Sequence, residues 1–364
     1  MKVIVTKENL NNALRKVICG ISSRAVLPIM ANVLLHAEGD RITVKAGDNE
    51  IVVTTWIPAL VEEEGETTLP AKKLQQIVSS LASGDITIES DADDNSKIMS
   101  GNSQFNIHGL NPVDYPKDTA NAYDWSFKMK SKELAKGIAM VVYARSTDDS
   151  RHQLNGVVMS IRSGMITFAA TDGRRLALFE TPLEDENAKD GDYILPSRAS
   201  VDLGKCMEDG GDTITISLNP SCVCFESLNT TLVTKLVEGA YPNFRQVIPK
   251  NCGSNVTVNR ENFINVLGRV SLVLTDNGPV RLTFANNNLT INGVSKETGS
   301  SEESIEVAYD GEEMSVSFNP SFFLEPLKVM DVDNVNLEFG KQYSPIKLTG
   351  DDGFLYMVMP MRNN

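Results

Sequence analysis

The chain has 364 residues, of which 41% are hydrophobic and 6% aromatic, a composition typical of globular cores rather than of disordered segments. It lacks the run of about 18 apolar residues that a membrane-spanning helix needs, and its first residues lack the apolar region of a signal peptide, so we expect a cytoplasmic protein with no membrane contact. The formal net charge of −14, taken alone, disfavours a nucleic-acid-binding surface. Five cysteines without Cys-x-x-Cys spacing and three scattered histidines predict reduced thiols and no metal site or cofactor.

A short strand that runs directly into a helix occurs three times along the chain. We predict these helices over the ranges 7–17, 130–140 and 260–270. Near each start stands a residue whose side-chain oxygen can accept a hydrogen bond from the first helical turn. The predicted N-caps are Thr6, Ser131 and Asn259.

A second helix follows later in each of the three copies, with a proline near its beginning that suits the first turn. We predict these helices over 71–81, 197–207 and 320–330. Pro326 lies inside the third of them and is expected to shorten or kink it, because proline removes a backbone hydrogen bond. Each of these helices is followed by a polar turn and an alternating strand, over 84–89, 211–217 and 333–338.

The repeats predict an α+β protein of three domains, each with two helices packed on antiparallel sheets. Polar segments join the copies, and related Tyr-Pro phrases at Tyr115-Pro116 and Tyr241-Pro242 come at the end of the first two. We therefore predict domains over 1–120, 125–250 and 254–364.

Asp172 and Gly173 separate two apolar runs in the second copy, a pattern typical of a β-hairpin. A two-residue type I′ turn would need positive φ at both residues. Arg174 and Arg175 follow at the head of the second apolar run. Their two guanidinium groups are either exposed to solvent at a hairpin end or the polar part of an apolar recognition site.

Charge is distributed unevenly between the predicted elements. The six predicted helices together carry a net charge of +8, so the remainder of the chain carries −22. A basic surface inside an acidic protein can hold a polyanion on one side and repel it elsewhere. The alternative is that helices simply favour Lys and Arg, although Glu is favoured equally and is scarce in these helices.

Several short motifs extend over nearly the full length of the chain. They are Leu27-Pro-Ile29, Leu69-Pro-Ala71, Leu154-Asn-Gly156, Ala170-Thr-Asp-Gly-Arg-Arg-Leu-Ala177, Lys235-Leu-Val-Glu-Gly239, Tyr241-Pro-Asn-Phe-Arg245, Val247-Ile-Pro-Lys250 and Val358-Met-Pro-Met-Arg362. With these motifs and its three copies, the chain resembles the bacterial DNA polymerase III β subunit family, the sliding clamps. The resemblance implies three DNA-clamp domains per chain, a closed ring formed by a head-to-tail homodimer, and helices that line a hole through which duplex DNA passes without sequence preference. It implies no catalytic activity.

The resemblance also implies residues that contact DNA, to which the basic helices add further candidates. By motif position, Arg24 matches a DNA-contacting arginine, and Arg151, His152 and Gln153 lie in a loop that contacts DNA leaving the ring. His152 and Gln153 depart from relatives that have aromatic residues there. The candidates from the helices are Lys72, Lys73, Lys136 and Arg198.

A partner-peptide pocket is implied between the second and third domains. Its residues, by motif position, are Leu154, Thr171, Gly173, Arg174, Arg175, Leu176, Pro242, Val247, Asn319, Met357, Met359, Pro360, Met361 and Arg362. Three of the methionines alternate along one expected strand, and methionine suits surfaces that accept several partners. The alternative is that they fill the core of a last strand. Gln246 and Asn363 depart from the residues common in relatives.

The implied ring interface pairs an edge strand of the first domain with the third domain of a second chain. Phe105, Ile107 and Lys73 would face Leu272, Glu303 and Glu306 of that chain. The implied partners are the clamp loader, the catalytic subunit of the replicative DNA polymerase, and other replication and repair proteins with clamp-binding motifs.

Two other classes of function are compatible with parts of the sequence. A monomeric β-rich scaffold would share the peptide pocket but form no ring. A hydrolase would use Asp172, Arg174 and His152 for acid–base chemistry. The sequence contains no nucleophile elbow, P-loop or metal spacing that would support an enzyme, and turn chemistry explains Asp172.

Overall fold

The structure is a computed structural model that describes residues 1–21, 27–116, 122–185, 187–207, 211–249, 252–275, 278–341 and 343–361. The described residues form two compact units. Unit 1 comprises Met1–Ala135, Leu183–Ala188 and Arg198–Val237, and unit 2 comprises Lys136–Pro182, Lys189–Ser197 and Glu238–Asn364. No helix in the described ranges is both long and apolar enough to cross a membrane.

Unit 1 holds two antiparallel sheets. Its strands are β1 (Lys2–Thr6), β2 (Asn32–Glu38), β3 (Arg41–Gly47), β4 (Ile51–Pro58), β5 (Leu60–Glu63), β6 (Gly65–Pro70), β7 (Asp85–Ser90), β8 (Asn95–Ser100), β9 (Ser103–His108), β10 (Trp125–Lys130), β15 (Thr213–Leu218), β16 (Cys222–Glu226) and β17 (Thr230–Lys235). One sheet has the order β5-β1-β7-β8-β9, and the other has the order β10-β15-β16-β17-β4-β3-β2-β6.

Unit 2 also holds two antiparallel sheets. Its strands are β11 (Gly156–Arg162), β12 (Met165–Thr171), β13 (Arg175–Pro182), β14 (Gly191–Pro196), β18 (Ser254–Asn259), β19 (Val280–Ala285), β20 (Asn288–Ser295), β21 (Gly299–Glu306), β22 (Met314–Phe318), β23 (Asn334–Phe339), β24 (Ile346–Thr349) and β25 (Phe354–Val358). The sheet orders are β14-β11-β12-β13-β25-β24-β23-β18 and β21-β20-β19-β22.

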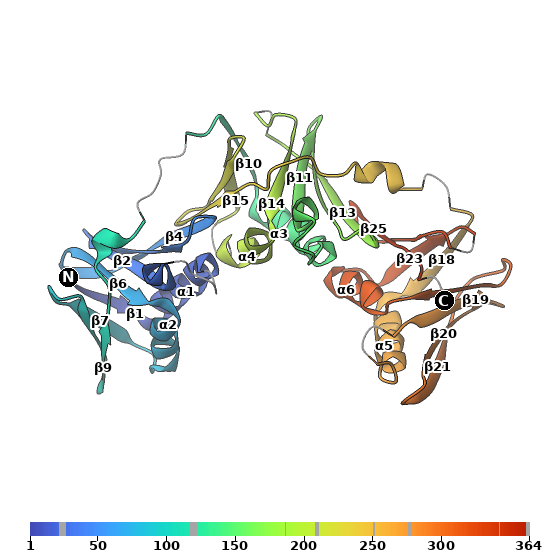
Figure 1. Cartoon of the computed structure of the whole chain (residues 1–364), viewed down its shortest axis with the longest axis horizontal. Helices are drawn as coiled ribbons and strands as arrows, with labels where there is room; N and C mark the ends of the chain where they lie inside the picture. Colours follow the sequence, from blue (N-terminus) through green and yellow to red (C-terminus); the bar gives the residue numbers. More distant parts are fainter. Residues whose placement is uncertain are drawn as a thin grey trace. The chain divides into compact units, whose positions relative to one another are not determined.

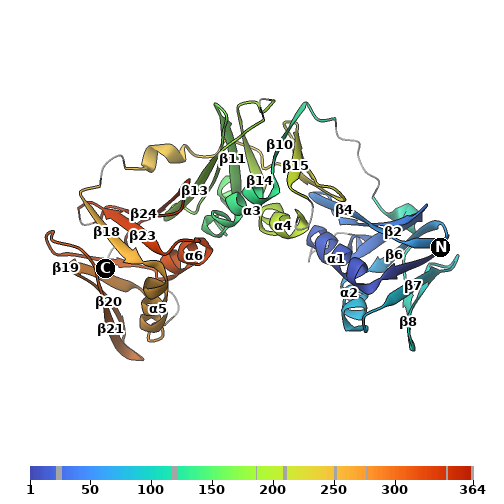
Figure 2. The same cartoon turned by 180° about the vertical axis from the view of Figure 1, so that it is seen from behind.

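All six predicted helices are confirmed to within two residues at each end. They are α1 (Lys7–Val17), α2 (Ala71–Ser80), α3 (Ser131–Ala139), α4 (Ser197–Met207), α5 (Arg260–Ser271) and α6 (Ser321–Val329). In unit 1, α1 packs against α2 and β4, and in unit 2, α5 packs against α6 and β21, as Figures 1 and 2 show from opposite sides. The buried side chains of α1 include Leu10 and Leu14, four residues apart on one helix face.

Two of the three predicted helix caps are confirmed. The side chain of Thr6 accepts a hydrogen bond from the backbone N–H of Asn9 at 3.3 Å, and the side chain of Asn259 accepts one from Asn262 at 3.0 Å. Ser131 behaves differently, because it is the first residue of α3 and its hydroxyl donates to the Gly211 carbonyl at 2.6 Å.

Pro326 lies inside α6, which continues beyond it to Val329. With nine residues, α6 is shorter than the matching helices α2, with ten, and α4, with eleven, as the prediction of a shortened helix requires. The three strands expected after the second helices are confirmed as β7, β15 and β23.

Each eight-stranded sheet joins strands from two successive copies of the repeat. In unit 1, β17 of the second copy pairs with β4 of the first, and in unit 2, β25 of the third copy pairs with β13 of the second. We call these pairings seam 1 (β17 with β4) and seam 2 (β25 with β13). The sharing of sheets explains why three sequence copies form two compact units, with the division falling in α3 and α4.

Both seams have the same register. Ile51, the first residue of β4, faces Thr234, the fifth of β17. Arg175, the first residue of β13, faces Val358, the fifth of β25. Two strands at the matching places in the repeat, β9 and β21, lie at the edges of their sheets and have one neighbour each.

Candidate functional site

The hairpin between β12 and β13 has a longer loop than the sequence pattern predicted. Thr171 faces Leu176 in the strand register, so four residues lie between the paired positions. Gly173 has a φ of 87°, but Asp172 is not among the described residues with positive φ, and the predicted type I′ turn is therefore wrong. The reason is the Asp172 carboxylate, which accepts hydrogen bonds from the backbone N–H groups of Arg174 at 2.8 Å and Arg175 at 3.1 Å.

Arg175 holds the hairpin in place, so its predicted role as a peptide ligand is corrected. Its side chain is only 9% exposed and forms ion pairs with Asp172, at 3.1 Å, and with Glu325 of α6. It also donates to the Tyr143 carbonyl at 2.7 Å, and its guanidinium carbon lies 4.5 Å from the centre of the Phe322 ring. Because these contacts occupy the guanidinium edge and one of its faces, Arg175 serves as an internal scaffold.

Arg174 remains an exposed cation beside the last strand. Its carbonyl accepts a hydrogen bond from the backbone N–H of Met359 at 2.8 Å. Two residues later, Met361 donates its N–H to the Ser317 carbonyl of β22 at 2.8 Å. The segment after β25 is therefore fixed to both sheets of unit 2.

The three methionines are not equivalent, contrary to the expectation of one shared strand face. β25 ends at Val358. Met357 is 4% exposed and faces Leu176, which is also 4% exposed, whereas Met359 is 45% exposed and Met361 is 39% exposed. Met357 and Leu176 belong to the core, so only the two later methionines present their side chains to a partner.

The segment around Tyr241 supplies further exposed apolar surface. Val247 is 61% exposed and Pro242 is also exposed, while Leu154 and Thr171 are partly buried. The Tyr241 hydroxyl accepts a hydrogen bond from the Thr171 N–H at 3.0 Å, which attaches this segment to the hairpin. Burial raises the pKa of the Tyr241 hydroxyl.

Sequence reasoning missed the anchoring role of Tyr241 and of Arg245. Arg245 pairs with Glu180 at 2.8 Å and donates to the Thr167 hydroxyl at 2.9 Å. The available signal for Tyr241 was the Tyr-Pro phrase shared with Tyr115.

Two other residues predicted to line the pocket are Asn319 and Arg362. The Asn319 side chain accepts hydrogen bonds from the N–H of Ser321 at 3.0 Å and from its hydroxyl at 2.8 Å, and so organises the start of α6. Arg362 lies outside the described residues. The exposed parts of the candidate pocket are Gly173, Arg174, Pro242, Val247, Met359 and Met361.

The basic residues predicted to contact DNA fall into two groups. Lys136 pairs with the buried Asp351 at 2.8 Å and lies 5.3 Å from the centre of the Phe179 ring. Arg198 pairs with Asp48 at 2.5 Å and donates to the Gly20 carbonyl at 3.0 Å. Each of these two cations pairs with a carboxylate of its own unit, while the side chain of Lys136 is 40% exposed and that of Arg198 is 34% exposed, so both stay predicted phosphate contacts.

The second group is exposed. Lys72 and Lys73 lie side by side in the sequence on α2 and face solvent. Arg151 is 47% exposed, pairs with Asp148 at 3.1 Å and donates to the Asp172 carbonyl at 3.1 Å. His152 and Gln153 are exposed in the short 3-10 helix His152–Leu154 that follows it. Arg24 lies outside the described residues.

The residues predicted for a ring interface lie on or near the two edge strands. Phe105 and Ile107 are partly exposed on β9. Leu272, just after α5, is 82% exposed, and Glu303 of β21 pairs with Arg269 at 2.7 Å. The hydrogen bond from Arg269 lowers the pKa of Glu303 despite partial desolvation.

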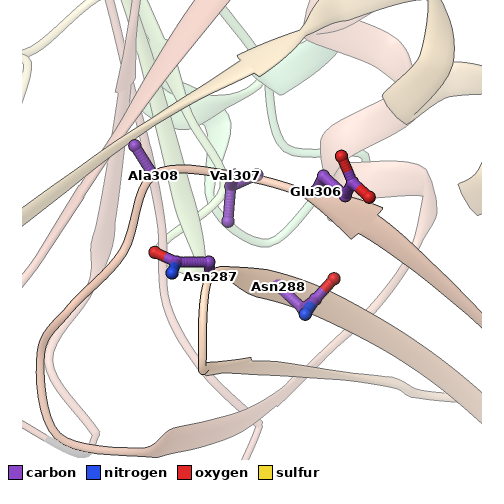
Figure 3. Close-up of a pocket in the computed structure, with 5 residues that line it drawn as sticks. All are labelled: Asn287, Asn288, Glu306, Val307 and Ala308. Carbon is purple, nitrogen blue, oxygen red and sulfur yellow. The ribbon is translucent and has the colours of Figure 1, made fainter.

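A shallow hollow of about 530 Å³ lies at the end of β21. It is lined by Asn287, Asn288, Glu306, Val307 and Ala308, which Figure 3 labels. The Val307 N–H donates to the Asn287 carbonyl at 3.0 Å, and the Tyr309 N–H donates to the Asn287 side chain at 3.2 Å. Asn287 therefore has a structural role, and Glu306 lies at the rim of the candidate interface.

Three family models match the chain in succession. They describe the DNA polymerase III beta subunit, with its N-terminal domain at residues 1–119, its central domain at 128–243 and its C-terminal domain at 245–362. The beta sliding clamp of Chlamydia pneumoniae is 30% identical over 365 residues, which cover 100% of this chain and 99% of that protein. The beta sliding clamp of Caulobacter vibrioides is 29% identical over 371 residues, covering 100% of both.

Solved structures of sliding clamps have the same fold. A Caulobacter crescentus beta sliding clamp with polyethylene glycol bound to a beta-motif tethering region matches with a TM-score of 0.91 and 28% identity, over 100% of this chain and 99% of that one. A Pseudomonas aeruginosa sliding clamp bound to griselimycin matches with a TM-score of 0.91 and 26% identity, over 100% of both chains.

Proposed function

The chain belongs to the DNA polymerase III beta subunit family, the sliding clamps, and from this premise we propose which of its residues close the ring, contact DNA and hold partners. A sliding clamp is a processivity factor without catalytic activity, which keeps a DNA polymerase on its template. The succession of three clamp domains along the chain carries this conclusion. We place the domain limits at 1–120, 125–250 and 254–364, and the protein in the cytoplasm.

We propose that β9 and β21 form the ring interface between two copies of the chain. The repeat places β9 at the position of β17 and β25, and β21 at the position of β4 and β13. Both internal seams join such a pair of strands, whereas β9 and β21 are edge strands that can pair with another chain. A head-to-tail dimer then has two further seams of the same kind and closes into a ring.

The register of the internal seams specifies the register of this interface. The first residue of one strand faces the fifth residue of the other, which places Gly299 opposite Ile107 of the second chain. The same rule places Glu302 opposite Gln104. The exposed side chain of Leu272 and the partly exposed Phe105 supply the apolar contact beside the paired strands, and Lys73 supplies a cation for Glu303 or Glu306.

Contacts to DNA are assigned to exposed and partly exposed polar residues and, by motif position alone, to Arg24, which lies outside the described residues. We propose that Lys72, Lys73, Lys136, Arg198 and Arg24 interact with phosphate groups inside the ring. Arg151, His152 and Gln153 are proposed to contact DNA that leaves it. Phosphate contacts carry no sequence information and weaken with salt, which suits a protein that slides. A closed ring that encircles DNA stays on it without binding it tightly, so the net charge of −14 is compatible with this function.

The exposed apolar surface around Met359 is the proposed site for partner peptides. Met359, Met361, Val247 and Pro242 provide the apolar contacts, and Arg174 provides hydrogen-bond donors at the rim. The partners are short segments of the polymerase catalytic subunit, the clamp loader, and other replication and repair proteins. Micromolar affinity, about −8 kcal/mol, is expected for such segments.

The proposed function is tested by loading the protein with a clamp loader onto nicked circular DNA and then cutting the circle. A ring stays on closed circles and is lost from the ends of linear DNA. Equal retention on both forms would reject topological linkage and leave direct binding as the mode of attachment.

A further inference from the structure

Two cysteines from different copies of the repeat lie together in unit 1. Cys19 belongs to the short 3-10 helix Ile18–Gly20 that directly follows α1, and Cys206 lies in the last turn of α4. The helices α1 and α4 are neighbours in both views of the chain (Figures 1 and 2). Both cysteines are free thiols in the structure, and neither belongs to a candidate site for DNA, peptides or the ring interface.

The two thiols share one hydrogen-bond acceptor, the backbone carbonyl of Lys16. The Cys19 Sγ donates to this oxygen at 2.8 Å, and the Cys206 Sγ donates to it at 3.3 Å. Lys16 lies in the last turn of α1, where carbonyl groups have no partner within the helix and can accept hydrogen bonds from outside it. Because both sulfur atoms contact the same oxygen atom, they lie close to each other.

Contacts on either side of Cys19 fix its backbone against α4. The Gly20 carbonyl accepts a hydrogen bond from the Arg198 guanidinium of α4 at 3.0 Å. Gly20 also packs closely on the sheet, since a Cβ atom at this position would lie 2.5 Å from the Ala46 carbonyl oxygen of β3. Thus α4 contacts the chain at Lys16, before Cys19, and at Gly20, after it. The two thiols therefore meet at a defined place in the fold.

The two thiols differ in their access to solvent. Cys19 is partly exposed, whereas Cys206 is 0% exposed. The hydrogen bond with Cys19 and burial both raise the pKa of the Cys206 thiol, which keeps it protonated. Since oxidants react with exposed thiols, a dissolved oxidant reaches Cys19 first, with Cys206 beside it as a thiol that can react next.

We propose that Cys19 and Cys206 form a redox modification site, at which a peroxide converts the two thiols into a reversible disulfide between the end of α1 and α4. In the first step the Cys19 thiolate attacks one oxygen of hydrogen peroxide and the O–O bond breaks. Cys19 becomes a sulfenic acid, and the leaving hydroxide takes up the proton that the Cys19 thiol has lost, giving water.

The second step forms the disulfide. The Cys206 sulfur attacks the Cys19 sulfur and displaces its hydroxyl group, which leaves as water with the proton of the Cys206 thiol. In total the two thiols are oxidised to one disulfide, and one hydrogen peroxide is reduced to two molecules of water. A thiol reductant restores the two thiols by exchange.

The disulfide would join two copies of the repeat that the reduced protein holds together through seam 1 and other noncovalent contacts. A covalent link between residues far apart in the sequence lowers the conformational entropy of the unfolded chain, which stabilises the folded state. The oxidised protein should therefore unfold at a higher temperature than the reduced protein. This modification requires neither the proposed DNA contacts nor the proposed peptide site.

The test exposes the full-length protein to hydrogen peroxide, blocks the remaining thiols with iodoacetamide, and maps tryptic peptides by mass spectrometry without reduction. The expected product links the peptides of Cys19 and Cys206 and disappears after treatment with dithiothreitol. The Tm of the oxidised protein should be higher by about 5 °C or more, and dithiothreitol should reverse this shift. Cys252→Ser is the matched control, because Cys252 is also a partly exposed free thiol, and this variant should keep both the link and the Tm shift.

Serine variants separate disulfide formation from hydrogen bonding to the Lys16 carbonyl, because a serine hydroxyl can still donate to it. Cys19→Ser and Cys206→Ser should each abolish the link. In Cys206→Ser, the reagent dimedone should trap the sulfenic acid of Cys19, which has no second thiol to react with. Thermal unfolding of the reduced variants verifies that they are folded, and Cys206→Ala takes the place of Cys206→Ser if the buried hydroxyl prevents folding.

Four outcomes would overturn the proposal. The first is the absence of a link between Cys19 and Cys206 in the folded protein, and the second is a link that forms only in urea. The third is oxidation of Cys19 to a sulfinic acid while Cys206 stays reduced, which would show that the two thiols do not react with each other. The fourth is an equal Tm for the oxidised and reduced proteins.

Discussion

Met359→Ala is the substitution that most directly probes the candidate peptide site. Full burial of a methionine side chain stabilises a complex by about 1.5–3 kcal/mol. Met359 is 45% exposed in the free chain, so a bound peptide can cover less than half of that side chain. The expected loss is therefore about 1 kcal/mol, a roughly fivefold rise in Kd.

The assay is fluorescence anisotropy with a labelled peptide that carries Gln, Leu and Phe anchors. Leu228→Ala is the matched control, because Leu228 is 79% exposed and lies in unit 1. An unchanged Kd for Met359→Ala, or the same change for Leu228→Ala, would refute the assignment of the site. Leu176→Ala is a poor probe by comparison, since this side chain is 4% exposed and its loss should lower the free energy of unfolding by about 2–5 kcal/mol.

Three further predictions concern the hairpin, the pH dependence and DNA. Arg175→Ala should lower the free energy of unfolding by about 2–4 kcal/mol, because it leaves the partly buried Asp172 without its cation. The measurement is calorimetry, and an unchanged Tm would contradict the prediction. Burial alone would raise the pKa of the Glu180 carboxyl, but hydrogen bonds from Thr167 and Arg245 outweigh burial and lower it. The stability that this carboxylate contributes is therefore present above about pH 4.5 and is lost as the pH falls through the lowered pKa. In urea unfolding, the free energy of unfolding should fall less below that pH for Glu180→Gln than for the parent chain. Identical pH profiles for the two chains would contradict this prediction. Lys72→Ala should reduce the slope of log Kd for DNA against log salt by about 0.9, and an unchanged slope would exclude a phosphate contact at this residue.

The periodicity of the sequence was sufficient to locate the helices. Apolar spacing and the capping residues Thr6 and Asn259 are local features, and the helix limits follow from them. Local patterns could not predict the pairing of strands at the seams, because β17 and β4 are far apart in the sequence. The comparison of repeats predicts which strands correspond, but only the three-dimensional structure shows which of them pair.

The same limit explains the errors in the candidate site. Arg174 and Arg175 are adjacent and chemically identical, and only the positions of Glu325 and Phe322 decide that Arg175 is held inside the unit. Met357 and Met359 likewise differ only because β25 ends between them. For Lys136 and Arg198, a helical pattern could not show that each also pairs with a carboxylate from a distant part of the chain.

The ring interface is tested most directly by disulfide cross-linking across the proposed β9–β21 pairing. In a chain with Gln104→Cys and Glu302→Cys, oxidation should produce a covalent dimer, because the register of the internal seams places these two positions directly opposite each other. The parent chain and both single variants control for the native cysteines. In a control chain with Gln104→Cys and Ser300→Cys, the second cysteine lies two residues away from the position that faces the first, so the two Cβ atoms are too far apart for a disulfide. Efficient dimer formation by the first pair alone supports the ring, and no covalent dimer from either pair, or equal dimer from both, would contradict it.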